Sequence, residues 1–184
     1  RQSHDEPAEL AALKLVLAQA RGDASVIADA AERLSLIARN RARAEDTARA
    51  LEAFEALVGL PLEPAERFEA WHGLAQVAQT AGNTRRAEEA LLEASKQGPV
   101  PRRVEALLER AELQERRSAF EEAVASFTVV LGLAPRQAKA TAGLIAALRR
   151  LGDWQGLAEV LSVEAAHLPR PQAIPLYVEL ASLH

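Results

Sequence analysis

The sequence predicts an all-α protein, a right-handed α-solenoid of about ten helices arranged as antiparallel pairs. Apolar residues make up 49% of the 184-residue chain and aromatic residues only 4%, and Ala and Leu dominate, a mixture that favours helix over sheet. Turn residues and helix-closing prolines recur at spacings of 34 to 36 residues, which is typical of stacked helical repeats. No stretch approaches 18 consecutive apolar residues, so we expect no direct membrane insertion.

Turn residues, prolines and packing residues share one period. The turn residues are 36 and 34 positions apart, and the prolines repeat both spacings: Gly82, Ser118 and Gly152, then Pro99, Pro135 and Pro169. Five positions after each turn, and four positions after that, come the residues expected to pack between helices: Ala87, Ala123 and Leu157, then Leu91, Phe127 and Leu161. Gly or Ser permits a tight turn and Pro ends the second helix, so each period is one helix pair.

This period divides the chain into units. We expect a single α-solenoid domain over 1–184, made of an N-terminal helix (8–23), a degenerate repeat (24–64), three repeats (65–99, 100–135 and 136–170) and a partial repeat or capping helix (171–184). The predicted helices are 8–21, 24–40, 42–59, 65–81, 84–97, 101–116, 119–132, 137–150, 153–167 and 171–184. The turn of the degenerate repeat is placed near Asn40, although no Gly marks it.

Residues 71–99 carry the most complete pattern. They read Trp-x-x-Leu-Ala-x-x-Ala, Gly82, Ala87-x-x-x-Leu91 and Pro99, which resembles the tetratricopeptide repeat (TPR). Residues 119–135 and 151–169 are similar to the second helix and closing proline of that repeat. The repeat 100–135 departs from the pattern in its first helix, because Arg110 and Gln114 stand where Leu and a large residue are expected. Its first helix is therefore predicted to bury a stripe of apolar residues instead: Val104, Leu107, Leu108 and Ala111.

Small and aromatic residues give further packing expectations. Ala87 and Ala123 are predicted to lie where helices approach most closely, and Ala90 is placed on the outer face. Trp71 and Trp154 occupy repeat-defining positions, so we expect them to pack in the core, the alternative being that they stack on a ligand.

Charge and residue content argue against catalysis. The net charge is −4 with 26% charged residues, so no field of one sign would hold the chain on nucleic acid. There is no Cys, and the four His (His4, His72, His167 and His184) lack the spacing of a helix-borne zinc site. The nine Gly are scattered singly, unlike a phosphate-binding loop. We therefore expect a non-enzyme with no cofactor and no metal.

The TPR resemblance implies that the first helix of each pair lines a concave groove. The predicted binding residues are His72, Gln76 and Gln79, then Leu108, Glu112 and Glu115, then Ala146 and Arg149. Arg39 and Arg43 make one end of this groove basic, Arg149 and Arg150 make the other end basic, and its middle is acidic. We therefore expect a partner segment with basic residues near its centre. The alternative is that these are ordinary solvated helix faces.

The sequence thus predicts a non-catalytic scaffold that binds a peptide or helix of a partner protein, within a larger and, from its Arg-rich, Lys-poor composition, bacterial assembly. The alternative is a regulatory or oligomerisation domain of a larger protein whose catalytic or DNA-binding module lies elsewhere. Because the chain starts at Arg1 and has no Met, we expect a fragment or a processed product; the compartment, cytoplasmic or periplasmic, stays open. Residues 171–184 are apolar on nearly every side, which predicts self-association there.

Overall fold

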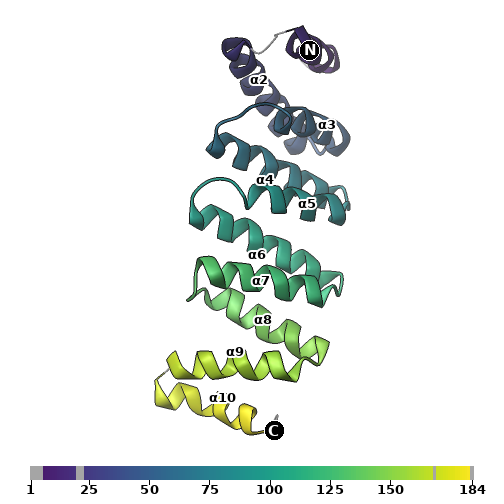
Figure 1. The fold of residues 1–184 in the computed structure, drawn as a ribbon. Coiled ribbons are helices and arrows are strands. Elements are labelled where there is room, and N and C mark those ends of the chain that lie inside the picture. Colours follow the sequence, from purple (N-terminus) through teal and green to yellow (C-terminus); the bar gives the residue numbers. More distant parts are fainter. Residues whose placement is uncertain (1–5, 20–22, 168, 183–184) are drawn as a thin grey trace. The chain divides into compact units, whose positions relative to one another are not determined.

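The computed structural model describes residues 6–19, 23–167 and 169–182. These residues form helices and no strand, which confirms the predicted all-α class (Figure 1). Each predicted helix is present; predicted helical positions 20, 21, 183 and 184 lie outside the described residues. The ten helices of this described part are α1 (Glu6–Gln19), α2 (Ala24–Arg43), α3 (Thr47–Val58), α4 (Pro64–Thr80), α5 (Thr84–Ala94), α6 (Val100–Arg116), α7 (Phe120–Leu133), α8 (Ala138–Leu151), α9 (Trp154–His167) and α10 (Arg170–Ser182).

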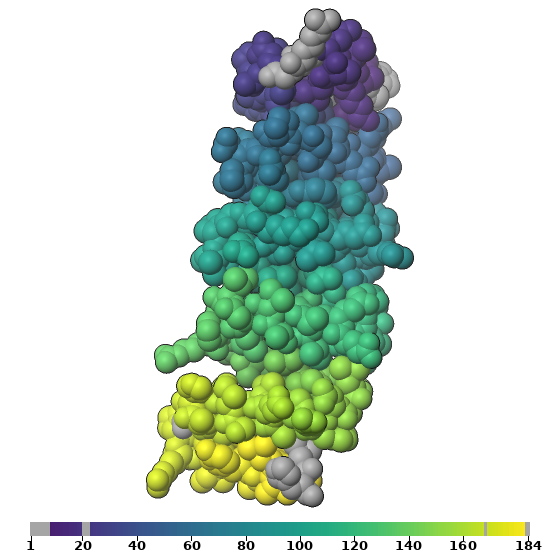
Figure 2. All heavy atoms as spheres, viewed as in Figure 1, coloured from purple at the N-terminus to yellow at the C-terminus, as the bar shows by residue number. Residues whose placement is uncertain are grey.

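The chain divides into two compact units, Arg1–Ala106 and Leu107–His184. The boundary falls inside α6. In the first unit α3 packs against α2 and α4, and α4 against α5. In the second unit α8 packs against α7 and α9, and α9 against α10. Within each unit the colours of Figure 2 follow the order of the sequence, so each helix packs mainly against its neighbours in the chain.

The three predicted turn residues all adopt the left-handed backbone conformation. Their φ angles are 74° at Gly82, 63° at Ser118 and 70° at Gly152. After Gly82, the amide of Asn83 donates to the carbonyl of Ala78 (2.8 Å), and equivalent bonds close the other two turns. The repeat period read from the sequence is therefore the period of these helix-ending turns.

The turn of the degenerate repeat lies later than predicted. Instead of ending near Asn40, α2 continues to Arg43, and Glu45 takes the left-handed conformation (φ 57°). The Asp46 amide donates to the Arg41 carbonyl (3.0 Å), so the helix end has the same closure as the turns that contain Gly. A glutamate in this conformation is uncommon, which explains why residue type gave no signal for the turn.

In each unit, a phenylalanine ring on one helix packs against a glycine on the next helix. A Cβ atom added to Gly73 on α4 would lie 2.5 Å from Cε1 and Cζ of Phe54 on α3. In the second unit, a Cβ on Gly143 of α8 would lie 2.6 Å from Cε1 of Phe127 on α7. Both rings are buried. The missing side chain at each glycine is the space that the ring occupies.

The two residues that depart from the repeat pattern form a buried polar network with α7. Arg110 donates from Nη1 to Ser126 Oγ (2.9 Å). The Gln114 amide donates to Ser126 Oγ (2.7 Å) and to the Glu122 carbonyl (3.1 Å), and its oxygen accepts from Arg110 Nη2 (3.2 Å). Gln114 and Ser126 are almost fully buried, so hydrogen bonds replace apolar packing here. The predicted apolar stripe of this helix is also buried: Val104, Leu107, Leu108 and Ala111.

Two packing expectations are wrong. Ala90 is fully buried rather than on the outer face, because it lies three residues after Ala87 and so shares its stripe on α5. Trp154 is 54% exposed at the first position of α9. Trp71 is half-buried, with the guanidinium of Arg86 5.9 Å from its ring centroid. Burial of Ala87 and Ala123 agrees with the predicted close helix approach at these positions.

Candidate functional site

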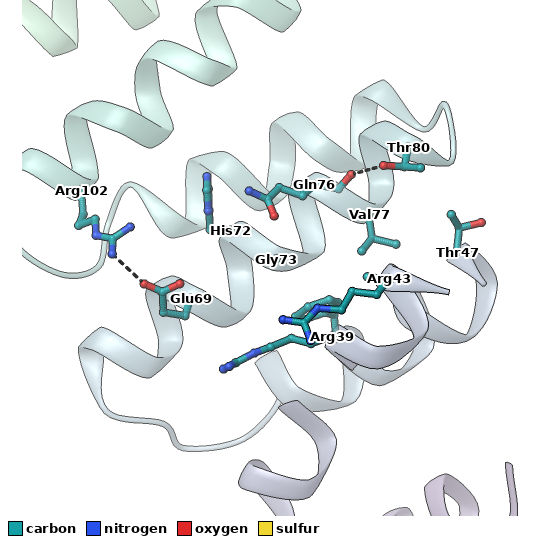
Figure 3. A pocket seen from close by; sticks show the side chains of 12 residues that line it. Arg39, Arg43, Thr47, Glu69, His72, Gly73, Gln76, Val77, Thr80 and Arg102 are labelled. Atoms are coloured by element: carbon teal, nitrogen blue, oxygen red, sulfur yellow. Dashed lines mark hydrogen bonds and ion pairs between the residues drawn. The ribbon is translucent and has the colours of Figure 1, made fainter. Parts of the chain in front are cut away.

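A pocket of about 760 Å³ opens between α2 and α4 in the first unit (Figure 3). Residues of α4 at helical spacing form one wall: Glu69, His72, Gly73, Gln76, Val77 and Thr80. The opposite wall comes from α2, with Thr47 and Phe54 of α3 and Arg102 at the start of α6 completing the pocket; the α2 residues are Arg39, Ala42 and Arg43. Each of these two walls is thus formed by one face of a helix, and the two helices lie side by side.

Gly73 and Phe54 shape the interior of the pocket. The ring of Phe54 is buried against Gly73, and both residues line the cavity. A larger residue at position 73 would displace this ring. The apolar part of the pocket lining therefore belongs to the core of the first unit.

An aromatic and cationic cluster defines one end of the pocket. His72 is 9% exposed and stacks on Phe68, with ring centroids 5.4 Å apart and planes 20° from parallel. The guanidinium of Arg102 lies 5.4 Å from the Phe68 ring centroid, a cation–π contact, and pairs with Glu69 (Nη2 to Oε1, 3.2 Å). Glu69, the one acidic residue among those lining the pocket, is therefore neutralised within the protein (Figure 3).

Two further arginines supply the charge of the α2 wall. Figure 3 shows Arg39 and Arg43 side by side along this wall. Both side chains are exposed, and within the described part of the chain neither pairs with a carboxylate, whereas Arg41 between them pairs with Asp46 (3.4 Å). The pocket thus has an excess of positive charge in a protein whose net charge is −4.

Uncharged polar groups complete the site. Gln76 is exposed, and the described residues offer its side-chain amide no hydrogen-bond partner, so the amide can both donate and accept toward a ligand. The Thr80 hydroxyl donates to the Gln76 carbonyl (3.0 Å), which leaves its oxygen as an acceptor. Thr47 adds a second hydroxyl beside Arg43. These groups can donate and accept hydrogen bonds toward a ligand.

The pocket brings together two of the three groove residues predicted on α4. His72 and Gln76 line it, whereas Gln79 does not. Successive residues of a helix are about 100° apart, so Gln79 lies on the face of α4 next to the one centred on Gln76. Arg39 and Arg43, predicted as the basic end of the groove, line the same pocket.

The remaining predicted residues lie in the second unit. Leu108 is buried, and Ala146 is exposed on α8. Glu112 forms an ion pair with Lys139, and burial raises the pKa of Glu115, with a further rise from the nearby Glu112 carboxylate.

Arg149, the last predicted binding residue, is already engaged. It makes a bidentate ion pair with Glu179 of α10 (Nε to Oε1, 2.9 Å; Nη2 to Oε2, 2.7 Å). The charge of Arg149 is thus neutralised within this unit by Glu179.

Sequence reasoning missed several residues of the pocket, among them Thr47, Phe54 and Arg102. Thr47 follows a turn whose position was wrong. Arg102 follows the left-handed turn at Gly98, and only the packing of α6 brings it to Glu69. The proline after Gly98 predicts the turn but not the direction of the helix that follows.

Metal-binding and membrane-spanning features are missing from the described ranges. Across them, no group of three or more His, Asp or Glu side chains is placed to hold a metal ion. His4 and His184 lie outside those ranges. No helix in the described part of the chain is long and apolar enough to cross a membrane.

Known proteins share the fold of this chain without close sequence similarity. A tetratricopeptide repeat protein from Parabacteroides merdae is 16% identical, with a TM-score of 0.54 over 95% of this chain and 64% of its own. A structure of Naa15/Naa10 bound to HypK-THB matches with 18% identity and a TM-score of 0.55, over 95% of this chain and 26% of the other. BtubC (BKLC) from P. vanneervenii matches with 15% identity and a TM-score of 0.50, over 96% and 80%.

No protein-family model matches the sequence, and no curated protein matches it significantly. The structural similarities establish the fold alone, a TPR-like helical repeat, and this confirms the resemblance read from the sequence.

Proposed function

We propose that this protein is a non-catalytic scaffold that binds a peptide or helix of a partner protein between α2 and α4. The observation that carries the proposal is the pocket itself, which is open and about 760 Å³ in volume. It is lined by exposed Arg39, Arg43 and Gln76, whose side-chain polar groups have no hydrogen-bond or ion-pair partner among the described residues. A TPR-like fold supports a protein-interaction role in general, and the open pocket supports binding between α2 and α4.

The test is a selection of random twelve-residue peptides on the protein, followed by measurement of affinity for a Gln76→Trp variant. Gln76 is exposed, so the indole fills the pocket without disturbing the core. We expect the variant to bind the selected peptides about tenfold more weakly. Gln155→Trp, at an exposed position of α9, is the matched control and should bind as the wild type does. Enrichment of no peptide, or equal binding by Gln76→Trp, would contradict the proposal.

A second candidate function is oligomerisation. Ile174, Tyr177 and Val178 on α10 are 53% to 65% exposed and lie on one face of the helix. An apolar face of this kind is favourable to bury against another chain. This observation supports the alternative of an oligomerisation domain, and the two functions do not compete for the same residues.

A further inference from the structure

We propose that the pocket between α2 and α4 selects an extended peptide segment with two acidic side chains separated by one residue. The proposal rests on the proposed function, since it names the class of peptide that this pocket binds. It concerns acidic side chains within the segment, not a terminal carboxylate.

The first argument for an acidic peptide is the charge of the pocket. Its one acidic residue, Glu69, is paired with Arg102 at 3.2 Å. Arg39 and Arg43 have no carboxylate partner among the residues described, and both are exposed. Two like charges one helical turn apart repel each other, so a bound carboxylate relieves this repulsion. Guanidinium groups also bind carboxylates with two parallel hydrogen bonds, which makes them selective for acidic side chains.

The second argument is the spacing of Arg39 and Arg43, which sets the spacing of the two acidic side chains. Residues four apart on a helix are separated by about 6 Å along its axis. Alternate residues of an extended chain point to the same side and are about 6.6 Å apart. Two acidic side chains at positions i and i+2 of an extended segment therefore match Arg39 and Arg43 when the segment runs along α2. A single terminal carboxylate would leave one of the arginines without a partner.

The opposite wall suits the rest of such a segment. Gln76 offers an amide that can bond to the peptide backbone, and Phe54 and Val77 provide apolar lining. The sequence predicted a partner with basic residues near its centre, because α6 carries several acidic residues. The charge of the pocket favours an acidic partner instead. Two of those acids have partners in the chain: Glu105 pairs with Arg102 (3.6 Å) and Glu112 with Lys139.

The net charge of the protein favours a peptide over nucleic acid. At −4 it repels a polyanion at long range, whereas a segment with two acidic groups meets mainly the local charge of the pocket. Few aromatic rings are available for base stacking, since the pocket is lined by the buried ring of Phe54 and by His72.

The experiment measures binding of fluorescein-labelled, C-terminally amidated twelve-residue peptides by fluorescence anisotropy. One peptide has Asp-Val-Asp at its centre; the others have Asn-Val-Asn, adjacent aspartates, Lys-Val-Lys, or no acidic residue and a free C-terminal carboxylate. We expect the Asp-Val-Asp peptide to bind about tenfold more tightly than any of these, and more weakly as salt is added. A single-stranded RNA twelve-mer tests polyanion binding.

The protein variants are Arg39→Gln/Arg43→Gln and the charge reversal Arg39→Glu/Arg43→Glu. The first should lose about tenfold in affinity for the Asp-Val-Asp peptide, and the second should prefer Lys-Val-Lys. Arg85→Gln is the matched control, because Arg85 is exposed on α5 outside the pocket; circular dichroism verifies folding.

The outcomes separate the two proposals. Equal binding of Asp-Val-Asp and Asn-Val-Asn, or tighter binding of RNA or of the free carboxylate, overturns the acidic preference. If selected peptides still lose affinity for Gln76→Trp, the scaffold function stands without that preference. If neither designed nor selected peptides bind, both proposals are wrong.

Discussion

The ring of Phe54 lies where the side chain of Gly73 would be, with two ring atoms 2.5 Å from the position that a Cβ atom would take. The same two residues line the pocket between α2 and α4. Core packing and the shape of the candidate site therefore depend on one contact between α3 and α4. Phe127 and Gly143 form the same kind of contact in the second unit.

This contact predicts that Gly73→Ala is destabilising. Alanine favours helix over glycine by about 1 kcal/mol, but displacement of a buried ring costs about 1–3 kcal/mol, so the net effect is a loss of up to about 2 kcal/mol. Urea unfolding measures it. Gly132→Ala on α7 is the control, since nothing lies within 4 Å of its added Cβ, and it should stabilise the protein. Phe54→Leu should remove most of the cost of Gly73→Ala in a double-mutant cycle; additive effects would rule out the clash.

Both buried alanines of α5 should resist enlargement. Ala87→Leu and Ala90→Leu each insert atoms where no exposed surface exists, at a cost of about 1–3 kcal/mol. Thermal melts compare them with Ala125→Leu, at an exposed position of α7, which should change stability by about 0.5 kcal/mol or less. A neutral Ala90→Leu would show that the stripe of α5 is assigned incorrectly.

The polar network of α6 and α7 should be costly to break but replaceable as a whole. Ser126→Ala removes the acceptor of Arg110 and a partner of Gln114, and it should destabilise by about 1–3 kcal/mol because buried polar groups are left unpaired. The triple variant Arg110→Leu/Gln114→Leu/Ser126→Ala restores apolar packing. It should recover most of this loss in chemical denaturation. A triple variant less stable than Ser126→Ala would mean that the network contributes net stability.

Stability should depend on the protonation of Glu115. Its pKa is raised in the folded state by burial and by Glu112, so the ionised form disfavours folding. That contribution is absent at pH values below the pKa of the unfolded state, grows as the pH rises from that pKa to the pKa of the folded state, and is constant above it. Glu115→Gln should therefore be more stable than the wild type at pH 7, with the difference gone near pH 3. The free energy of unfolding at the two pH values checks this, and a pH-independent difference would contradict it.

The exposed face of α10 predicts a dimer that depends on protein concentration. Burial of two side chains such as Tyr177 and Val178 supplies about 3–6 kcal/mol before the cost of association. Sedimentation across a hundredfold range of concentration should detect the dimer, and Tyr177→Ser/Val178→Glu should abolish it. Val163→Glu, also exposed but on α9, is the control. A strict monomer at every concentration would contradict this prediction.

Local sequence patterns predicted the helices and their order, because turn chemistry acts within a few residues. Gly82 and Gly152 are where glycine is needed, whereas Glu45 adopts the same conformation without a residue preference to indicate it. The TPR resemblance also predicted that His72 and Gln76 lie on the same face of α4, and both line the pocket. Arg102 could not be placed, because its contact with Glu69 depends on how α6 packs after Gly98. Trp154 is a second example, because its position in the repeat predicted a core residue whereas its side chain is exposed. Exposure also depends on the neighbouring side chains, which differ between repeats.

Because Phe54 belongs both to the core and to the pocket, local opening of α3 and loss of the binding surface are one event. A ligand held between α2 and α4 then raises the free energy of that opening, even where it contacts no residue of α3. Amide hydrogens of α3 would exchange more slowly with solvent deuterium when the pocket is occupied. Hydrogen exchange in this helix therefore reports occupancy of the pocket, whatever the chemical nature of the ligand.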